Sequence, residues 1–406
     1  MASSGIGLRA FLLVAVLLLV GACAAQVTPP PAERPPEARV APLAFADLPG
    51  WAGDDLEGVR TALIRSCTRL LAQPADRPLG DAVVIGTVAD WRGPCTELAG
   101  LGDQKTALRA YLESHFQPYR LSDGAQDTGL FTGYYEAELR GSLRREGRYQ
   151  TPIYTRPAEL VTVDLGQFRS ELRGQRIAGR VRDGRLEPFA TRAEIEAGAL
   201  AGRNLEILWV DDPVDSFFLH IQGSGRVRMV DGSTVRLGYE SQNGHPYVAI
   251  GRELVRRGEM PLDQVSMPSI RTWLAAHPDQ AAQVMAANPS YVFFRRTEGE
   301  GPIGAQGAAL TPGRSLAVDR RYVPMGVPVW LDTLDPFDAN RPLRRLVVAQ
   351  DTGGAITGVV RGDIFFGYGA AAAEQAGQMR RQGRYYLLLP RAVVPRTILQ
   401  GTAPGA

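Results

Sequence analysis

Two aspartates near the C-terminal end of the sequence have the residue type and the setting for glycoside chemistry. Asp351 ends the apolar segment LVVAQ, and Asp363 begins the apolar segment DIFFG. Gly353 and Gly354 lie between them, and glycines let a ligand approach the backbone closely, which suits the floor of a groove for a flat sugar. An aspartate at a strand end can equally cap a turn, so it is the pair that indicates a site.

The number of carboxyl groups that the reaction needs separates two kinds of glycan chemistry. Ordinary glycosidases use two, one as acid and one as base or nucleophile. If the C6 hydroxyl of the cleaved sugar attacks its own C1, a single residue can donate a proton and then take one back. We expect no metal and no cofactor, because the tight alternate spacing of calcium ligands is missing and the sequence has no dinucleotide-binding or P-loop motif. A third aspartate, Asp319, is interpreted as a structural tie in a turn or loop.

The composition is that of an ordinary globular chain. The length of 406 residues favours more than one domain. A hydrophobic content of 45% and a charged content of 22% are normal for a folded protein. The net charge of +2 is too small for a nucleic-acid-binding surface, so we expect no nucleic-acid partner.

The first residues predict export from the cytoplasm. Arg9 precedes the apolar run FLLVAVLLLV, as in the n-region and h-region of a signal peptide, and this run is too short to span a bilayer comfortably. Small residues then lead into Cys23, as in a bacterial lipobox. Residues 1–23 are therefore predicted to be a lipoprotein signal peptide that ends at a lipidated Cys23. The alternative is an ordinary secretory signal with a chance cysteine.

The segment after Cys23 predicts how the folded part is attached. Residues 24–43 are rich in proline and are typical of an extended tether. By resemblance to other bacterial lipoproteins, Ala24 directly after the cysteine favours the outer membrane. The predicted location is the periplasm, with a lipid anchor in the outer membrane.

Two further cysteines, Cys67 and Cys95, belong to the part expected to fold. In an oxidising periplasm an even pair of cysteines can form a disulfide. The sequence therefore predicts a bond between them, and two buried free thiols are the alternative.

Hydrophobic spacing divides the chain into regions with a helical pattern and regions with a strand pattern. Residues 55–73 and 104–117 have helical spacing, so the first section is expected to be helix-rich. From Gly129 onward the pattern alternates and predicts strands and turns, and this reading continues through residues 205–240, where Asp231 and Gly232 indicate a hairpin turn.

Helices and strands also divide the second half of the chain. Residues 245–260 predict a helix that ends near Gly258, and two short helices broken at Pro278 follow. The last third is predicted to be mostly β, with one helix at residues 369–382 that ends at Gly383.

Several motifs resemble one family of bacterial cell-wall enzymes. The pieces AVDRRYVPMG, QDTGGAITG and GDIFFG are similar to its three-aspartate domain. FTGYYEAELRGS, YQTPIY, RAEIEAGAL, FFLHIQGSGRV, NGHPYVAIGRELVRRGEM and NPSYVFF resemble the signature of membrane-bound lytic transglycosylase A, and all occur in the order of the family. The resemblance covers residues 44 to 395.

The resemblance implies a fold that is mainly β with helices. Residues 44–137 and 289–400 would form a double-psi β-barrel domain, the three-aspartate domain. Residues 138–288 would form a second, smaller β-barrel domain inserted into it, with the sugar groove between the two. The strand pattern of the sequence agrees with this division. It indicates a β-rich insert near 138 to 288, after which the barrel resumes at Tyr291.

The resemblance also implies site residues. The last of the three aspartates is the catalytic acid of the family, which is Asp363 here, and Asp351 would support it in the same site. The motifs FTGYY and IQGSG would contribute groove residues, namely Thr132, Tyr134, Tyr135, Gln222 and Ser224. Neighbouring strand residues face opposite ways, so the two tyrosines could also be core aromatics, and Gln222 could be a satisfied strand residue.

The sequence departs from the family pattern at two points in the loop between Asp351 and Asp363. Eleven residues separate the two aspartates where the family pattern often has ten, and Thr357 stands where the pattern usually has a lysine. The extra residue is expected in the turn at Val359 and Val360.

The function that the resemblance implies is that of a peptidoglycan lytic exotransglycosylase, a lyase acting on a polysaccharide. It would cleave the β-1,4 bond between N-acetylmuramic acid and N-acetylglucosamine and leave a 1,6-anhydromuramoyl end. Its partners would be peptidoglycan glycan strands, the outer membrane through the lipid anchor, and other cell-wall enzymes. A β-glycan hydrolase that uses Asp351 as second carboxylate and a non-catalytic glycan-binding lipoprotein are the alternatives.

Overall fold

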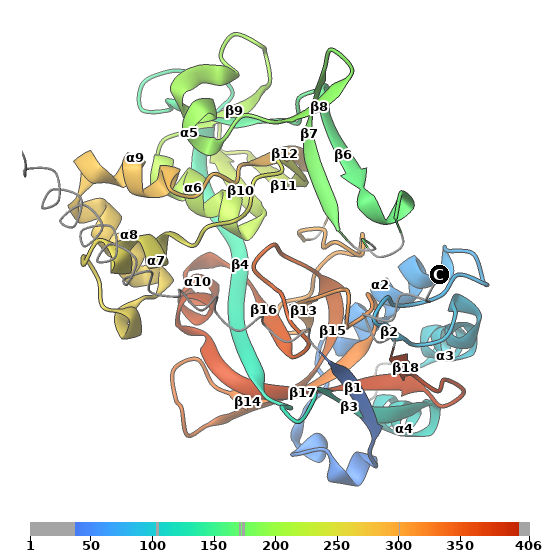
Figure 1. Ribbon diagram of the computed structural model, residues 1–406. Coiled ribbons are helices and arrows are strands. Elements are labelled where there is room, and N and C mark those ends of the chain that lie inside the picture. The colour runs from blue at the N-terminus through green and yellow to red at the C-terminus, as the bar shows by residue number, and fades with distance from the viewer. Residues whose placement is uncertain (1–36, 103–104, 170–171, 173–174, 300, 398–406) are drawn as a thin grey trace, which may run out of the picture. The chain divides into compact units, whose positions relative to one another are not determined.

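The computed structural model describes residues 37–102, 105–169, 172, 175–299 and 301–397 (Figure 1). The predicted signal peptide, Cys23 and most of the predicted tether lie outside these residues. The longer helices are α2 (Val59–Leu71), α3 (Val88–Gly100), α4 (Lys105–His115), α6 (Pro213–Gln222), α7 (Ile250–Arg256), α8 (Met267–Ala276), α9 (Pro278–Ala286) and α10 (Gly369–Gln378). Short turns of helix are η1 (Phe45–Asp47), η2 (Trp51–Gly53), η3 (Leu165–Gln167), α5 (Arg192–Glu194), the π-turn η5 (Ile195–Ala199) and η6 (Leu262–Gln264). Within the described residues, no helix is both long and apolar enough to cross a membrane.

Six strands close into a barrel. The closed order is β4 (Gly129–Ser142), β17 (Arg380–Pro390), β14 (Pro328–Leu334), β15 (Pro342–Asp351), β13 (Ser315–Val318) and β16 (Arg361–Tyr368), which pairs again with β4 (Figure 1). Strands β3 (Phe116–Asp123) and β1 (Ala38–Pro42) extend this sheet from β17. The pairs β13–β15 and β16–β4 are parallel although most other neighbours are antiparallel, so the chain must cross between distant strands.

A second sheet begins on the same strand β4. Its order is β5 (Thr151–Tyr154), β9 (Glu206–Val210), β4, β10 (Ser224–Met229), β11 (Thr234–Gln242) and β12 (Val292–Thr297). Smaller sheets pair β6 (Leu160–Asp164), β7 (Arg176–Arg182) and β8 (Arg185–Pro188), and also β2 (Val83–Val84) with β18 (Arg396–Thr397). The mainly β fold with helices is therefore confirmed.

The observed elements differ from the sequence interpretation at several points. The C-terminal end of the predicted tether is folded, because Ala38–Pro42 form strand β1, which pairs with β3, and Ala38 is buried in the main core. Residues 213–222 form helix α6, where the sequence indicated strands and turns. Helix α10 ends at Gln378, and Gly383 lies inside strand β17, so it does not end a helix. Strand β12 pairs with β11 of the second sheet. The sequence pattern had predicted that the chain returns to the barrel at Tyr291.

The main core lies inside the barrel and under the N-terminal helices. Trp330 is fully buried there, and Leu63 and Leu70 of α2 and Leu98 of α3 belong to the same cluster. A disulfide joins Cys67 of α2 to Cys95 of α3, with the two Cα atoms 5.4 Å apart. The expected pairing of the two cysteines is therefore present in the structure.

Helix α2 is tied to the end of β15 by a buried side chain. Gln350 has no exposed surface, and its amide donates to the carbonyl of Ala62 (3.0 Å) and to Ser66 Oγ (2.9 Å). The hydroxyl of Ser315 on β13 donates to its Oε1 at 2.6 Å. Because a buried polar group is costly when it is left unpaired, these bonds fix the position of the residue that precedes Asp351.

Candidate active site

Strand β13 brings the two predicted carboxylates together. Its residue Ala317 pairs with Asp351 of β15 on one side and with Asp363 of β16 on the other. Neighbouring strands lie about 4.8 Å apart, so the two aspartate backbones are separated by about 10 Å. Asp351 is the last residue of β15, as predicted, whereas Asp363 is the third residue of β16 rather than its first.

Asp363 lies in a short chain of hydrogen bonds. Thr132 on the neighbouring strand β4 donates its hydroxyl to Asp363 Oδ1 at 2.7 Å, and Arg361 donates from Nη2 to that hydroxyl oxygen at 2.8 Å. Thr132 and Asp363 are directly opposite in the β4–β16 register. The hydrogen bond to Oδ1 fixes the carboxyl group and leaves Oδ2 for another partner.

The surroundings of Asp363 favour its neutral form. Burial of the side chain is the largest effect and raises the pKa of Asp363 to about 6. The positive charge of Arg361 and the hydrogen bond from Thr132 oppose that rise, and the negative charge of Asp351 adds the smallest contribution to it. A carboxyl with this pKa can donate a proton near neutral pH and take one back as an anion.

Asp351 has a different environment. Its Oδ1 accepts from the backbone N–H groups of Ala305 and Thr352, both at 2.9 Å, and its Oδ2 accepts from the hydroxyl of Tyr134 at 2.9 Å. Burial raises the pKa of Asp351, and these three hydrogen bonds oppose the rise. All three hydrogen-bond partners of Asp351 are donors, and an ionised carboxylate, which can only accept hydrogen bonds, needs such partners.

The alternation along β4 separates the two predicted tyrosines. Tyr134 faces Asp351 and packs on Phe365, with the ring centroids 5.3 Å apart. Tyr135 points into the core of the second sheet, and burial raises the pKa of its hydroxyl while a hydrogen bond from Arg271 opposes the rise. Tyr134 therefore contacts one of the two predicted carboxylates. Tyr135 is instead a core aromatic residue, which was the alternative interpretation.

The motif IQGSG has local structural reasons for its residues. Gln222 is the last residue of helix α6, not a strand residue, and its Oε1 accepts from the backbone N–H of Tyr135 at 2.9 Å. Ser224 is buried at the start of β10. Gly223 ends α6 in the left-handed conformation, with φ 74°. A Cβ on Gly225 would stand 2.5 Å from Leu219, so close packing alone accounts for that glycine.

The glycines between the two aspartates are different. Gly353 and Gly354 are exposed, and neither is among the residues with positive φ. A Cβ added to Gly354 would meet no atom within 4 Å, and one added to Gly353 would meet Ile356 at 3.3 Å. Packing and backbone conformation thus do not require glycine at 354, which leaves the accessible backbone as the property that glycine supplies there.

Asp319 holds the loop between the carboxylates in place. It is buried, pairs with Arg321 at 2.6 Å, and accepts from the backbone N–H of Gly358 at 2.9 Å. Val359 and Val360 are buried just before β16 begins. The contacts of Asp319 are those of the structural tie that the sequence suggested.

Sequence reasoning missed two residues near Asp363. Arg361 lies two residues before Asp363 in the same strand, and the period of two along a strand places both side chains on one face. Tyr247 lies on the loop between β11 and α7 and is 39% exposed. Burial raises the pKa of the Tyr247 hydroxyl, and the charge of Asp363 contributes to that rise. The period of two could have identified Arg361, but no local signal connects Tyr247 with Asp363.

The described residues hold no group of three or more His, Cys, Asp or Glu side chains arranged to bind a metal ion.

Comparisons with known proteins agree on one family. The family described as MltA specific insert domain matches residues 130–295, and the 3D domain family matches residues 314–389. The membrane-bound lytic murein transglycosylase A of Escherichia coli K12 is 33% identical over 294 residues, which is 70% of this chain and 69% of that protein.

Solved structures extend this similarity to the fold. A membrane-bound lytic murein transglycosylase from Agrobacterium tumefaciens has a TM-score of 0.76 and 36% identity, covering 87% of this chain and 98% of that one. MltA from Neisseria gonorrhoeae in a monoclinic crystal form has a TM-score of 0.75 and 33% identity, covering 89% and 95%. The Escherichia coli MltA structure with bound chitohexaose has a TM-score of 0.64 and 26% identity, covering 86% and 94%.

Proposed function

The chain belongs to the membrane-bound lytic murein transglycosylase A family, and we propose that Asp363 is the single residue that acts as acid and then as base in its reaction. As a member of this family the chain is a peptidoglycan-cleaving lytic transglycosylase. The observation that carries the proposed role is the setting of Asp363: a carboxyl with a pKa raised to about 6 whose Oδ1 is fixed by Thr132.

In the first step, protonated Asp363 donates its proton to the glycosidic oxygen between N-acetylmuramic acid and N-acetylglucosamine. With a pKa of about 6, about one tenth of the sites carry this proton at pH 7. The bond between C1 of the muramoyl ring and the leaving oxygen breaks, and positive charge builds at C1. The new anion on Asp363 is stabilised by the hydrogen bond from Thr132 and by the charge of Arg361.

In the second step, the Asp363 carboxylate accepts the proton of the C6 hydroxyl, and O6 forms a bond to C1 of the same ring. The product is a 1,6-anhydromuramoyl end, and Asp363 is protonated again. The nucleophile is part of the substrate, so its approach costs little entropy. We assign to Asp351 a supporting role, because its anion, held by three donors, can stabilise the positive charge that develops at C1.

The groove residues belong to the same proposal. Thr132 and Tyr134 act by holding the two carboxylates, and the exposed backbone at Gly353 and Gly354 is where a sugar ring could lie against the chain. The division into a barrel domain and an inserted domain with the groove between them also stays a proposal. It is supported by the two sheets that share β4.

A hydrolase that uses Asp351 as a second carboxylate is the competing reaction. Both enzymes would release muropeptides, but the hydrolase would add water to C1. Mass spectrometry of purified sacculi digested with the protein separates them. The proposed reaction gives fragments with 1,6-anhydro ends, and fragments heavier by one water with reducing ends would exclude it.

We also propose an anchor for the location of the enzyme. Its curated relatives are named membrane-bound, and the short apolar run ending at Cys23 supports lipidation of this cysteine. The lipid would hold the enzyme in the outer membrane on its periplasmic side, where glycan strands and other cell-wall enzymes are within reach.

A further inference from the structure

The small sheet formed by β6, β7 and β8 has one face that carries no polar side chain. In an antiparallel sheet, residues that lie directly opposite each other on neighbouring strands point to the same face. The register of the three strands therefore assigns one set of side chains to a single face, which we call the outer face: Val161, Val163, Ile177, Val181, Leu186 and Pro188. Gly179, which adds no side chain, completes it. The outer face is thus apolar at every position across three strands.

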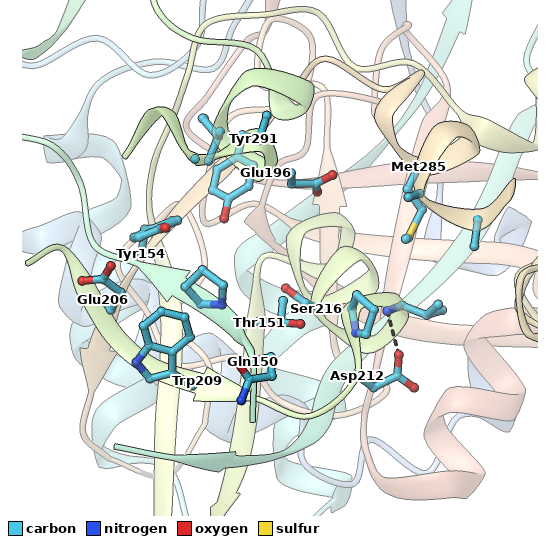
Figure 2. A pocket seen from close by; sticks show the side chains of 18 of the residues that line it. Gln150, Thr151, Tyr154, Glu196, Glu206, Trp209, Asp212, Ser216, Met285 and Tyr291 are labelled. Carbon is cyan, nitrogen blue, oxygen red and sulfur yellow. Dashed lines mark hydrogen bonds between the residues drawn. The ribbon is translucent and has the colours of Figure 1, made fainter. Parts of the chain in front are cut away.

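The opposite face of the small sheet packs on a buried cluster that includes residues of the second sheet. Leu160 of β6 has no exposed surface and lies there with Tyr154 and Tyr291, and Ala178 of β7 packs against the same cluster. The two tyrosines also line an open cavity of about 1030 Å³ (Figure 2). Because Leu160 and Ala178 alternate with residues of the outer face along their strands, the outer face is turned away from this cluster.

Solvent reaches the outer face although it is apolar. Val181 is 57% exposed, Ile177 is 44% exposed and Leu186 is 40% exposed. An antiparallel sheet with one solvated face normally turns polar side chains to water and apolar ones to the core, so the small sheet has the reverse arrangement. The outer face presents on the order of 400 Å² of apolar surface, and an exposed patch of that size is often functional.

Arginines accompany the apolar residues on these strands. The sequence from Leu160 to Pro188 has six arginines and four acidic residues. Three of the arginines are in ion pairs with acidic residues of the same sheet, at 3.5 to 4.0 Å. Arg185, which directly precedes Leu186, has no ion-pair or hydrogen-bond partner among the described residues, and neither has Arg169 in the connection after β6. These two side chains can therefore contact an anionic group without first breaking a bond inside the described part of the protein.

The composition of the outer face selects among possible partners. A second copy of the chain would need a larger surface, because a standard interface buries about 800 Å² on each partner. A glycan strand presents hydroxyl and amide groups that must be hydrogen-bonded when they are covered, and the outer face offers no side chain for this. The hydrocarbon region of a lipid bilayer needs only apolar contact, and anionic headgroups suit the neighbouring arginines.

We propose that the outer face of the small sheet rests on a phospholipid bilayer, with its apolar side chains directed toward the acyl chains. Arg169 and Arg185 contact phosphate groups of the lipids. Phe168, which is 76% exposed in the connection between β6 and β7, adds a further exposed ring next to this sheet. The inference rests on the lipid anchor proposed above, which places the chain at such a bilayer.

The length of chain between the anchor and the fold allows this contact. Residues 24–36 separate Cys23 from the first described residue, and a proline-rich chain of that length reaches about 40 Å when it is extended. The anchor alone thus holds the folded part close to the bilayer without fixing which side faces it. At the resulting local concentration even a weak contact is occupied, so the outer face sets the orientation of the enzyme on the membrane.

A fluorescent label on the intact, lipidated protein in vesicles tests the orientation. The sequence has three cysteines, of which Cys67 and Cys95 form the disulfide and Cys23 is the proposed lipidation site, so an introduced cysteine is the single free thiol. Leu186→Cys places an NBD group on the outer face. Val230→Cys places it on the turn between β10 and β11, where Val230 is 64% exposed. In vesicles of phosphatidylethanolamine and phosphatidylglycerol, we expect dithionite to reduce the label at position 186 about tenfold more slowly than the label at position 230.

Threonine variants separate the apolar contact from folding. Ile177→Thr and Val181→Thr together keep β-branched side chains, which suit strands, but they place hydroxyl groups on the outer face. This pair should bring the dithionite rate at position 186 close to the rate at position 230, whereas the matched Val230→Thr should leave the rate at position 186 unchanged. Replacing phosphatidylglycerol by phosphatidylcholine should also raise the ratio of the rate at 186 to the rate at 230, because the arginines lose their anionic partners.

The possible outcomes keep this proposal separate from the proposed reaction. Equal dithionite rates at the two positions would overturn the membrane contact. Protection at position 186 that disappears when the protein is diluted among vesicles would assign the outer face to a second copy, and protection by chitin oligomers in detergent solution would assign it to the glycan, so either result also overturns the proposal. Protein that does not float with the vesicles would overturn the anchor and this inference together. Loss of 1,6-anhydro products with the expected label protection would overturn the reaction alone.

Discussion

Replacement of Asp363 by asparagine tests both the proposed acid and base and its electrostatic environment. The substitution keeps the size of the side chain, and the amide oxygen can still accept from Thr132. It removes the proton that leaves in the first step and the anion that takes one back in the second. A general acid or base contributes about 10²–10⁴ to a rate, and Asp363 serves in both roles. We therefore expect turnover to fall by about 10⁴, which corresponds to about 5 kcal/mol in the barrier.

The same variant should be more stable than the parent at alkaline pH. The pKa of Asp363 is raised from 3.8 to about 6 in the fold, so the folded state binds the proton more tightly than the unfolded state. The stabilising effect of this proton is complete below pH 3.8 and is lost as the pH rises through about 6. At pH 8 the ionised side chain therefore costs about 3 kcal/mol, and at pH 4 about 0.6 kcal/mol. Asparagine avoids this cost, and its Tm should exceed that of the parent by about 4 °C at pH 8 and by much less at pH 4.

Two measurements decide the outcome. Release of 1,6-anhydro muropeptides from purified sacculi gives the rate, and thermal unfolding at pH 4 and pH 8 gives the stability. Asp183→Asn is a matched control, because Asp183 is exposed in a turn with φ 49°, a conformation that asparagine also adopts. Near-normal activity of Asp363→Asn together with an inactive Asp351→Asn would show that the two roles are assigned the wrong way round. A Tm difference that does not change with pH would refute the electrostatic explanation.

Four further outcomes are expected from other parts of the chain. Thr132→Val removes a hydrogen bond that stabilises the anion of Asp363. It should therefore raise the pKa of Asp363 and move the alkaline limb of the pH–rate profile to higher pH. An unchanged profile would contradict this. Asp351→Asn should reduce turnover by less than Asp363→Asn does. It should move the alkaline limb only slightly to lower pH, because the charge of Asp351 adds the smallest contribution to the raised pKa of Asp363. A shift of a full pH unit would show stronger coupling between the two carboxyl groups. The disulfide between Cys67 and Cys95 closes a loop with a sequence separation of 28, for which chain entropy gives about 3–4 kcal/mol, so the denatured, unreduced protein should resist alkylation and a double serine variant should lose that stability. Cys23→Ser should abolish lipidation and release the protein from membrane fractions, and unchanged fractionation and mass would exclude the anchor.

The carboxylate pair was predictable because its signals are local. Apolar strand residues, an aspartate at a strand end and nearby glycines can all be read within a few positions of Asp351 and Asp363. The period of two along a strand predicted correctly that Tyr134 and Tyr135 face opposite ways. What the local pattern could not provide is the position of β13 between the two strands, because that register depends on pairing between segments far apart in the chain.

Helix α6 shows how strand propensity can mislead. The segment DSFFLH contains aromatic residues that favour strands, and it follows the true strand β9. The sequence nevertheless held a helix start signal: Asp212 accepts from the backbone N–H groups of Val214 and Asp215, and Pro213 occupies the first helical turn. For Gly383, the turn preference of glycine was taken as a helix end, but the residue pairs with Gly129 inside the barrel and has no room for a Cβ against Thr333.

Strand β4 limits how the barrel and the second sheet can be separated by deletion. Its 14 residues hold Thr132 beside Asp363 near one end and pair with β9 through Gly141 and Ser142 at the other. An inserted domain joined by loops could be deleted and replaced by a short linker. Here any such cut falls within or directly beside a strand that completes the barrel, so the excised barrel would keep an unpaired, aggregation-prone stub. The two sheets should therefore behave as one unit in expression, evolution and design, and the active site is inherited only with both.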